Sequence, residues 1–183
     1  MPFRYSIRRY QELASTNTSV QEFAKRGAKE GLVVHADYQT RGRGKPGNHW
    51  VSERGENLLF SILLRPPVKP AKAPLVTQIA CRSVAAVLKK DYKIESQFKR
   101  PNDILVDGRK ICGVLVEASS QSGGKLDHLV IGIGLNVNTE PKKIARTISM
   151  RTIKGKKINR EKVFKAILSQ LRKDVLPLYA AAS

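Results

Sequence analysis

The chain has 183 residues and 41% hydrophobic side chains, which is enough for one domain with a continuous core and excludes a disordered basic tail. Its 34 Lys and Arg outnumber 15 Asp and Glu, so the formal net charge is +19. Such an excess favours proteins that bind nucleic acid or an acidic partner. Composition alone leaves the function open.

Several classes of protein are excluded by simple patterns. No run approaches 18 consecutive apolar residues, so we expect no membrane span. The N-terminus has no apolar segment typical of a secretory signal, which favours a cytoplasmic location. Cys81 and Cys112 lie far apart and form no C-x-x-C, and the three histidines are scattered. A disulfide framework and a zinc enzyme are therefore not expected.

The first half of the chain alternates helix and strand signals. Ser15, Thr16 and Asn17 are good N-cap residues before apolar positions at helical spacing, so a helix is predicted to begin there and to end before Gly31. Predicted next, in chain order, are a strand over 32–36, a glycine-rich loop over 41–47, a strand over 57–64 and an amphipathic helix over about 74–90.

The second half begins with a β-hairpin signal. Strands over 104–106 and 111–116 flank Asp107-Gly108, a pair that supplies the positive φ angles of a tight turn. A further strand is predicted over 129–137, and its two glycines, at 132 and 134, indicate that a ligand or another part of the chain approaches closely.

A last helix is predicted from about Asn159 to Pro177. These elements indicate an α+β fold, with a mixed β-sheet flanked by helices, in a single domain over 1–183. Its C-terminal part, at about 141–183, is a basic helical segment. Within it, residues 141–174 hold twelve basic and two acidic residues. That stretch is a solvated face, a surface for an acidic partner or a polyanion site.

Two stretches of sequence could carry chemistry. In the first, 39–50, glycines and basic residues alternate, so backbone N–H groups and cations could hold a phosphate or a carboxylate, although a solvated turn fits equally. In the second, Lys99 to Asp103 precede the hairpin that carries Lys110. Lys110 could pair with a carboxylate or a polyphosphate, or lie on the surface; Asp103 could hold Mg²⁺ or cap a turn.

The order of the motifs resembles the biotin protein ligase catalytic domain, from about Ser15 to Asn138. The series reads S-T-N, Q-T-x-G-R-G-x-x-G-x-x-W, K-x-P-N-D, R-K-x-x-G-V-L-V-E and G-I-G-x-N-V-N. Lipoate ligases are more distant, because their usual Ser-Gly-Gly-Gly loop is missing. The resemblance implies the ligase fold and a monofunctional enzyme without the N-terminal DNA-binding domain and the small C-terminal β-domain.

The resemblance also implies a reaction in two steps. The biotin carboxylate attacks the α-phosphate of ATP, which gives biotinyl-5′-AMP and pyrophosphate. A lysine amine of a biotin carboxyl carrier protein then attacks the mixed anhydride. ATP with Mg²⁺ and biotin would be the small molecules bound, and a carrier domain of a carboxylase the protein partner. No specific DNA binding and no membrane are expected, and a homodimer is possible.

Roles carry over by motif. Lys110, Arg43 and Lys99 would be catalytic, and Asp103 would hold Mg²⁺. The residues implied for biotin are Ser15, Thr16, Asn17, Gln39, Gly42, Arg43, Lys110, Gly113 and Leu115. Those implied for ATP and the adenylate are Arg43, Lys45, Trp50, Lys99, Asn102 and Asn136.

The sequence departs from the family pattern at three positions. Lys45 and Asn48 stand where arginines are expected, and Arg100 stands where tryptophan is usual. Lysine keeps the charge but loses the planar fork of arginine, so a weaker grip on the adenylate is expected. Two alternatives remain: a relative that handles lipoate or octanoate, or a weak paralogue acting as a basic nucleic-acid- or protein-binding module.

Overall fold

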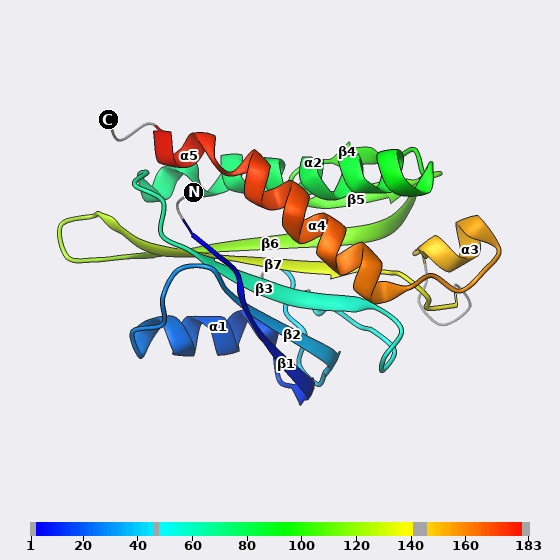
Figure 1. Cartoon of the computed structure of the whole chain (residues 1–183), viewed down its shortest axis with the longest axis horizontal. Coiled ribbons are helices and arrows are strands. Elements are labelled where there is room, and N and C mark those ends of the chain that lie inside the picture. The colour runs from blue at the N-terminus through cyan, green and yellow to red at the C-terminus, as the bar shows by residue number, and fades with distance from the viewer. Residues whose placement is uncertain (1–2, 46–47, 141–145, 181–183) are drawn as a thin grey trace.

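The computed structural model describes residues 3–45, 48–140 and 146–180, which form a seven-stranded sheet covered by helices on both faces (Figure 1). The strands are β1 (Ser6–Leu13), β2 (Leu32–Gln39), β3 (Leu58–Leu64), β4 (Gln97–Lys99), β5 (Asp103–Val106), β6 (Arg109–Ser120) and β7 (Leu126–Leu135). Their order across the sheet is β1-β2-β3-β7-β6-β5-β4. Only β1 and β2 pair in parallel among these strands, so the sheet is mixed, as predicted.

The helices divide between the two faces of the sheet. They are α1 (Thr16–Lys25), α2 (Ala73–Tyr92), α3 (Met150–Lys154), α4 (Arg160–Asp174) and α5 (Pro177–Ala180), with a 3-10 turn at Pro70–Lys72. In Figure 1, α1 lies below the sheet and α2, α4 and α5 lie above it. The two predicted long helices and the predicted helix after Ser15 are confirmed within a few residues at their ends.

The centre of the sheet is buried on both faces because both are covered. All seven residues of β3 are buried, which explains its continuous apolar sequence. Its side chains alternate: Phe60 and Ile62 pack in the large core under α2 and α4, and Leu63 packs in a smaller core under α1. The α1 helix covers only part of its face, and the uncovered remainder is where the pocket described below lies.

The hairpin between β5 and β6 forms as the sequence predicts. Asp107 has φ 49° and Gly108 φ 71°, so both turn residues occupy the left-handed region that the tight turn requires. The hairpin brings Asp103, at the start of β5, opposite Gly113 of β6. It therefore places the K-x-P-N-D motif beside Lys110.

The C-terminal segment is tied to the sheet by polar side chains. Both ends of the Asn138 amide bond the backbone of Ile158, at 3.0 and 2.8 Å, and Arg160 pairs with Asp37 at 3.0 Å. The predicted helix after Asn159 ends at Asp174, and Pro177 begins α5, because proline fits the first turn of a helix. The basic stretch predicted over 141–174 lies partly outside the described residues. Its described part includes α4, whose apolar side chains pack in the large core.

Strand β1 was not predicted. Six of its eight residues are exposed, and its sequence, SIRRYQEL, does not alternate apolar and polar residues cleanly. Its place depends on parallel pairing with β2, from Ser6 beside Leu32 to Leu13 beside Gln39. In the described residues no helix is both long and apolar enough to cross a bilayer.

We predict an acid-sensitive stability from His35, a 6% exposed side chain on β2. Burial is the main cause that lowers its pKa from 6.5 to about 4, against the opposing charge of Asp37. As the pH falls, the His35 side chain takes up its proton in the unfolded chain before it does so in the folded protein. The contribution of His35 to the free energy of unfolding is therefore complete above pH 6.5 and declines towards pH 4. The loss should be about 1–3 kcal/mol. Urea unfolding of His35→Gln, compared with the parent at both pH values, measures it; equal pH dependence would contradict the prediction.

Candidate active site

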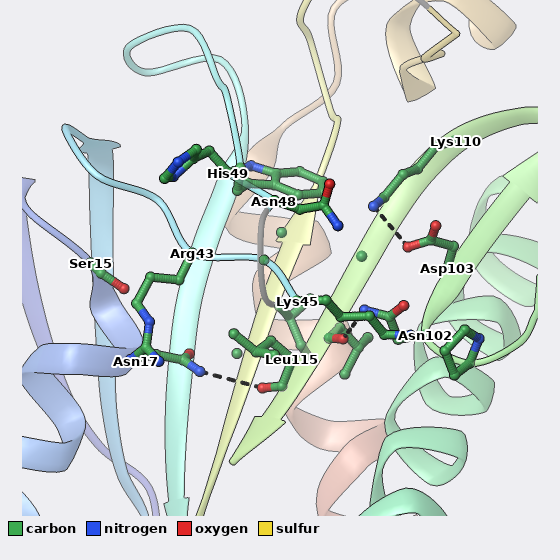
Figure 2. Close-up of a pocket in the computed structure, with 18 of the residues that line it drawn as sticks. Ser15, Asn17, Arg43, Lys45, Asn48, His49, Asn102, Asp103, Lys110 and Leu115 are labelled. Atoms are coloured by element: carbon green, nitrogen blue, oxygen red, sulfur yellow. Dashed lines mark hydrogen bonds and ion pairs between the residues drawn. The ribbon is translucent and has the colours of Figure 1, made fainter.

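A pocket of about 380 Å³ opens on the face of the sheet that carries α1. Its lining comes from the start of α1, the 39–50 loop, the 99–103 segment and strands β6 and β7. Figure 2 shows Ser15, Asn17 and Arg43 on one side and Lys110 and Asp103 on the other. Segments far apart in sequence therefore meet around one cavity.

The floor of the pocket is made of glycines on paired strands. Gly113 of β6 lies opposite Gly134 of β7, and Leu115 lies opposite Gly132. A Cβ on Gly134 would lie 2.5 Å from the Trp50 ring, and a Cβ on Gly132 would overlap Asn17 Oδ1. The close approach that the two glycines of β7 predict is thus confirmed. The groups that approach are two side chains of the chain itself.

One end of the pocket holds a network of neutral polar groups at the start of α1. The Thr16 N–H donates to Gln39 Oε1 at 2.7 Å, and the Thr16 and Ser61 hydroxyls lie 2.7 Å apart. Ser61 Oγ in turn donates to Asn17 Oδ1 at 2.5 Å. Ser15 occupies the N-cap position but makes no side-chain cap bond, which leaves its hydroxyl to the pocket.

Glu117 joins this network to the glycine-rich loop. Its Oε2 accepts from Asn17 Nδ2 at 2.8 Å, and its Oε1 pairs with the Arg43 guanidinium. No role was predicted for Glu117 from the sequence, although it ends the motif around Lys110. The signal lay in the two-residue period of a strand, which places Gly113, Leu115 and Glu117 on the same face.

The opposite end of the pocket is cationic. Lys110 Nζ lies 2.7 Å from Asp103 Oδ1 and 5.4 Å from the centroid of the Trp50 ring. The Lys110 backbone is held on both sides, since its N–H donates to Arg146 O and its C=O accepts from the Ile148 N–H, each at 3.0 Å. The ammonium group therefore projects from a fixed backbone.

Three further cations line this end: Lys45, Lys99 and Arg100. None of them pairs with a carboxylate within the described residues. Asn102 fixes the segment that carries two of them, because its Nδ2 donates to Val114 O at 2.8 Å. The pocket thus has uncompensated positive charge and suits an anionic ligand.

Cys112 does not contribute a nucleophile. It lies fully buried on β6, and burial raises the pKa of its thiol well above the ordinary value. A thiolate is needed for nucleophilic attack, so this side chain is inert at neutral pH.

Most residues predicted for the site lie together in the pocket. The predicted residues that line it are Ser15, Thr16, Asn17, Gln39, Arg43, Lys45, Trp50, Lys99, Asn102, Asp103, Lys110, Gly113 and Leu115. Gly42 and Asn136 do not line it. Gly42 O accepts from the Trp50 N–H at 2.9 Å, and Asn136 Nδ2 donates to Lys110 O at 3.3 Å. Their contact with a ligand remains a prediction.

Comparison with known proteins adds independent support for the resemblance. The chain is 36% identical to the bifunctional ligase/repressor BirA of Bacillus subtilis over 163 residues, which cover 85% of this chain and 49% of that protein. It is 30% identical to the biotin–[acetyl-CoA-carboxylase] ligase of Mycobacterium tuberculosis, over 73% of this chain and 50% of that protein. The chain spans about half the length of the curated relatives it matches.

Solved structures agree with the sequence matches. The Aquifex aeolicus biotin protein ligase, in complex with biotin and ATP, has a TM-score of 0.78 at 28% identity, over 96% of this chain and 72% of that one. The Leishmania major biotin protein ligase with biotinyl-5-AMP has a TM-score of 0.69 at 26% identity, over 96% and 80%. Residues 10–136 match the sequence pattern of the biotin/lipoate A/B protein ligase family. The chain therefore belongs to the biotin/lipoate A/B protein ligase family.

Proposed function

We propose that the chain activates biotin with ATP to biotinyl-5′-AMP and transfers biotin to a lysine of a biotin carboxyl carrier protein. The observation that carries the proposal is the pocket itself, in which a neutral hydrogen-bonding end faces a cationic end that contains Lys110. A small polar head group with a carboxylate tail fits the first end, and phosphates fit the second. The Mycobacterium tuberculosis relative is named a biotin–[acetyl-CoA-carboxylase] ligase, and the Leishmania major ligase structure contains biotinyl-5-AMP, which supports the proposal.

In the first step, a biotin carboxylate oxygen forms a bond to the α-phosphorus of ATP while the bond to pyrophosphate breaks. Two anions must approach each other, so positive charge at the reacting oxygens lowers the barrier. Lys110 supplies that charge, because its side chain is 33% exposed and directed into the pocket. Lys99 and Arg100 line the same pocket and would bind the leaving pyrophosphate.

In the second step, a carrier lysine amine attacks the acyl carbon of the mixed anhydride. The C–N bond forms, the C–O bond to AMP breaks, and the amine loses one proton to solvent or to AMP. No covalent enzyme intermediate is needed. The task of the pocket is to hold the adenylate in position until the carrier arrives, and the 39–50 loop serves this purpose.

Mg²⁺ fits the cationic end as a partner of the ATP phosphates. Mg²⁺ in nucleotide sites takes one or two carboxylates together with phosphate oxygens and water. Asp103 is the one carboxylate among the described residues that line the pocket, and its Oδ2 makes no bond to a described residue. When bound, the ion would screen the phosphate charges, and Asp103 would be its protein ligand.

Exchange of labelled pyrophosphate into ATP tests the first step. The proposal predicts exchange that requires biotin and is not supported by lipoate or octanoate. A folded protein that exchanges only with lipoate or octanoate would reassign the substrate, and one that exchanges with none would contradict the ligase activity.

We predict that Lys45→Arg slows the release of biotinyl-5′-AMP. Lys45 lines the pocket and makes no ion pair with a described residue, whereas arginine would offer two parallel donors to one phosphate. One added charge-assisted bond corresponds to about a tenfold lower off-rate. Filter binding of labelled adenylate measures it. Equal off-rates for the two proteins would refute the prediction.

The proposed partner is a carrier domain, and further expectations from the sequence remain predictions. These are a homodimer, the absence of specific DNA binding and a cytoplasmic location. The basic stretch over 141–174 also keeps the three possible roles that its sequence allows, which are a surface for an acidic partner, a polyanion site and a solvated face.

A further inference from the structure

Glu117 is a second carboxylate, besides Asp103, close to a pocket whose described lining is mainly cationic among its charged residues. It lies on β6, its side chain is 22% exposed, and both of its oxygens are engaged. Oε2 accepts from Asn17 Nδ2 at 2.8 Å, while Oε1 pairs with Arg43. A free carboxylate here would repel an anionic ligand, but the negative charge of Glu117 is engaged by Asn17 and Arg43. These two contacts indicate the structural role of the carboxylate.

The first partner fixes the direction of the polar network. A carboxylate only accepts hydrogen bonds, so Asn17 must present its NH₂ group to Glu117 and its carbonyl oxygen to Ser61. Ser61 then donates its only proton to Asn17. The one proton of the Thr16 hydroxyl is then left for two acceptors, Ser61 Oγ at 2.7 Å and Gln39 Oε1 at 3.0 Å. Glu117 and the Leu115 C=O, which accepts from Asn17 Nδ2 at 3.4 Å, thus fix the orientation of the Asn17 amide together.

The second partner connects Glu117 to the loop over the pocket. The two ends of this loop are paired with each other through the backbone. Arg43 forms an antiparallel β-bridge with His49, and the Trp50 N–H donates to Gly42 O. Arg43 is the one residue of the loop that reaches a carboxylate of β6 in the described residues. The ion pair therefore holds the paired ends, and Trp50 with them, against the sheet.

We propose that Glu117 is a positioning residue, which helps to orient Asn17 for the biotin head group and holds Arg43, with the paired loop ends at 42–43 and 49–50, beside the bound biotin. The inference rests on the proposed function and assigns a role to a residue outside the pocket lining. Glu117 does not touch the reacting atoms and acts through its two partners.

Glu117→Gln separates the two roles. The glutamine oxygen still accepts from Asn17, but its NH₂ group faces Arg43 and cannot pair with it. Glu12→Gln is the matched control, because it removes an exposed ion pair with Arg54 that does not line the pocket. We expect the KM for biotin in pyrophosphate exchange to rise about tenfold in Glu117→Gln, which corresponds to about 1.4 kcal/mol, and to stay within about twofold of the parent in Glu12→Gln.

Two further measurements distinguish positioning from other roles. Trp50 is the only tryptophan, so acrylamide quenching of its fluorescence reports the loop in ligand-free protein. Quenching should rise in Glu117→Gln and not in Glu12→Gln. The KM for biotin of the double variant Arg43→Gln/Glu117→Gln should be no higher than that of Arg43→Gln alone, because Glu117 acts through Arg43.

The outcomes separate this proposal from the function on which it rests. If the parent protein shows no biotin-dependent exchange, the proposed function fails, and quenching alone decides whether Glu117 holds the loop. Unchanged quenching, or a KM for biotin that is unchanged or lowered in Glu117→Gln, would overturn the positioning role. A lowered KM would mean that the carboxylate only repels the ligand.

Discussion

Lys110→Met should reduce biotin-dependent pyrophosphate exchange by about a thousandfold while the protein stays folded. Methionine keeps the length and the apolar stem of the side chain but removes the charge that is placed to meet the reacting oxygens. It also leaves Asp103 without the cation that now lies 2.7 Å away, so a second anion faces the incoming carboxylate. Both effects act on the same step.

The control for this variant is Lys89→Met. Lys89 pairs with Glu95 at 3.2 Å on the exposed side of α2, so the same chemical change is made outside the pocket. Its exchange rate should match the parent within about twofold, since exposed ion pairs contribute little. Retention of more than about a tenth of the exchange activity by Lys110→Met would remove Lys110 from its catalytic role.

Gly134→Ala should displace Trp50 and weaken ATP binding strongly. The added methyl would lie 2.5 Å from the indole ring, and real Cβ atoms do not approach that closely. The ring must move, because the strand behind it is buried and paired on both sides. We expect the KM for ATP to rise about a hundredfold, with a shift in the Trp50 emission maximum, as about two or three kcal/mol of misfit are typical of overpacking.

Gly113→Ala is the matched control, since it lies directly opposite on β6. There the nearest atoms are Trp50 Cζ3 at 3.0 Å and the flexible end of Lys110 at 3.1 Å, so small movements relieve the contact. Its effect on the KM for ATP should be smaller by about fivefold or more. Equal effects of the two alanines would show that the position of Trp50 is not what matters.

Much of the fold follows from local patterns. The buried strand at 58–64, the hairpin around Asp107 and the helix after Asn159 are determined by residues close in sequence, and their predictions are confirmed. Strand β1 is not predicted by the sequence, because its exposed, charged residues show no regular alternation of apolar and polar side chains. Its position is defined only by pairing with Leu32 to Gln39, which are distant in sequence. The last long helix ends at Asp174, three residues before the predicted end, because Pro177 begins α5 and does not terminate α4.

The site divides in the same way. Motif order predicted which residues gather in the pocket, and the glycines of β7 indicated a close approach. The approaching groups could not be predicted, because Asn17 and Trp50 come from elements far away in sequence. Glu117 was missed for the same reason: its role appears only when α1 and the loop with Arg43 meet on β6.

The central claim is that this pocket joins biotin to AMP, and mass spectrometry of the products tests it most directly. Protein in excess, incubated with biotin, ATP and Mg²⁺, should yield biotinyl-5′-AMP and pyrophosphate in equal amounts, and Lys110→Met should yield neither in the same time. Biotin-dependent formation of ADP and phosphate, or binding of both substrates by folded protein without any adenylate, would contradict the account.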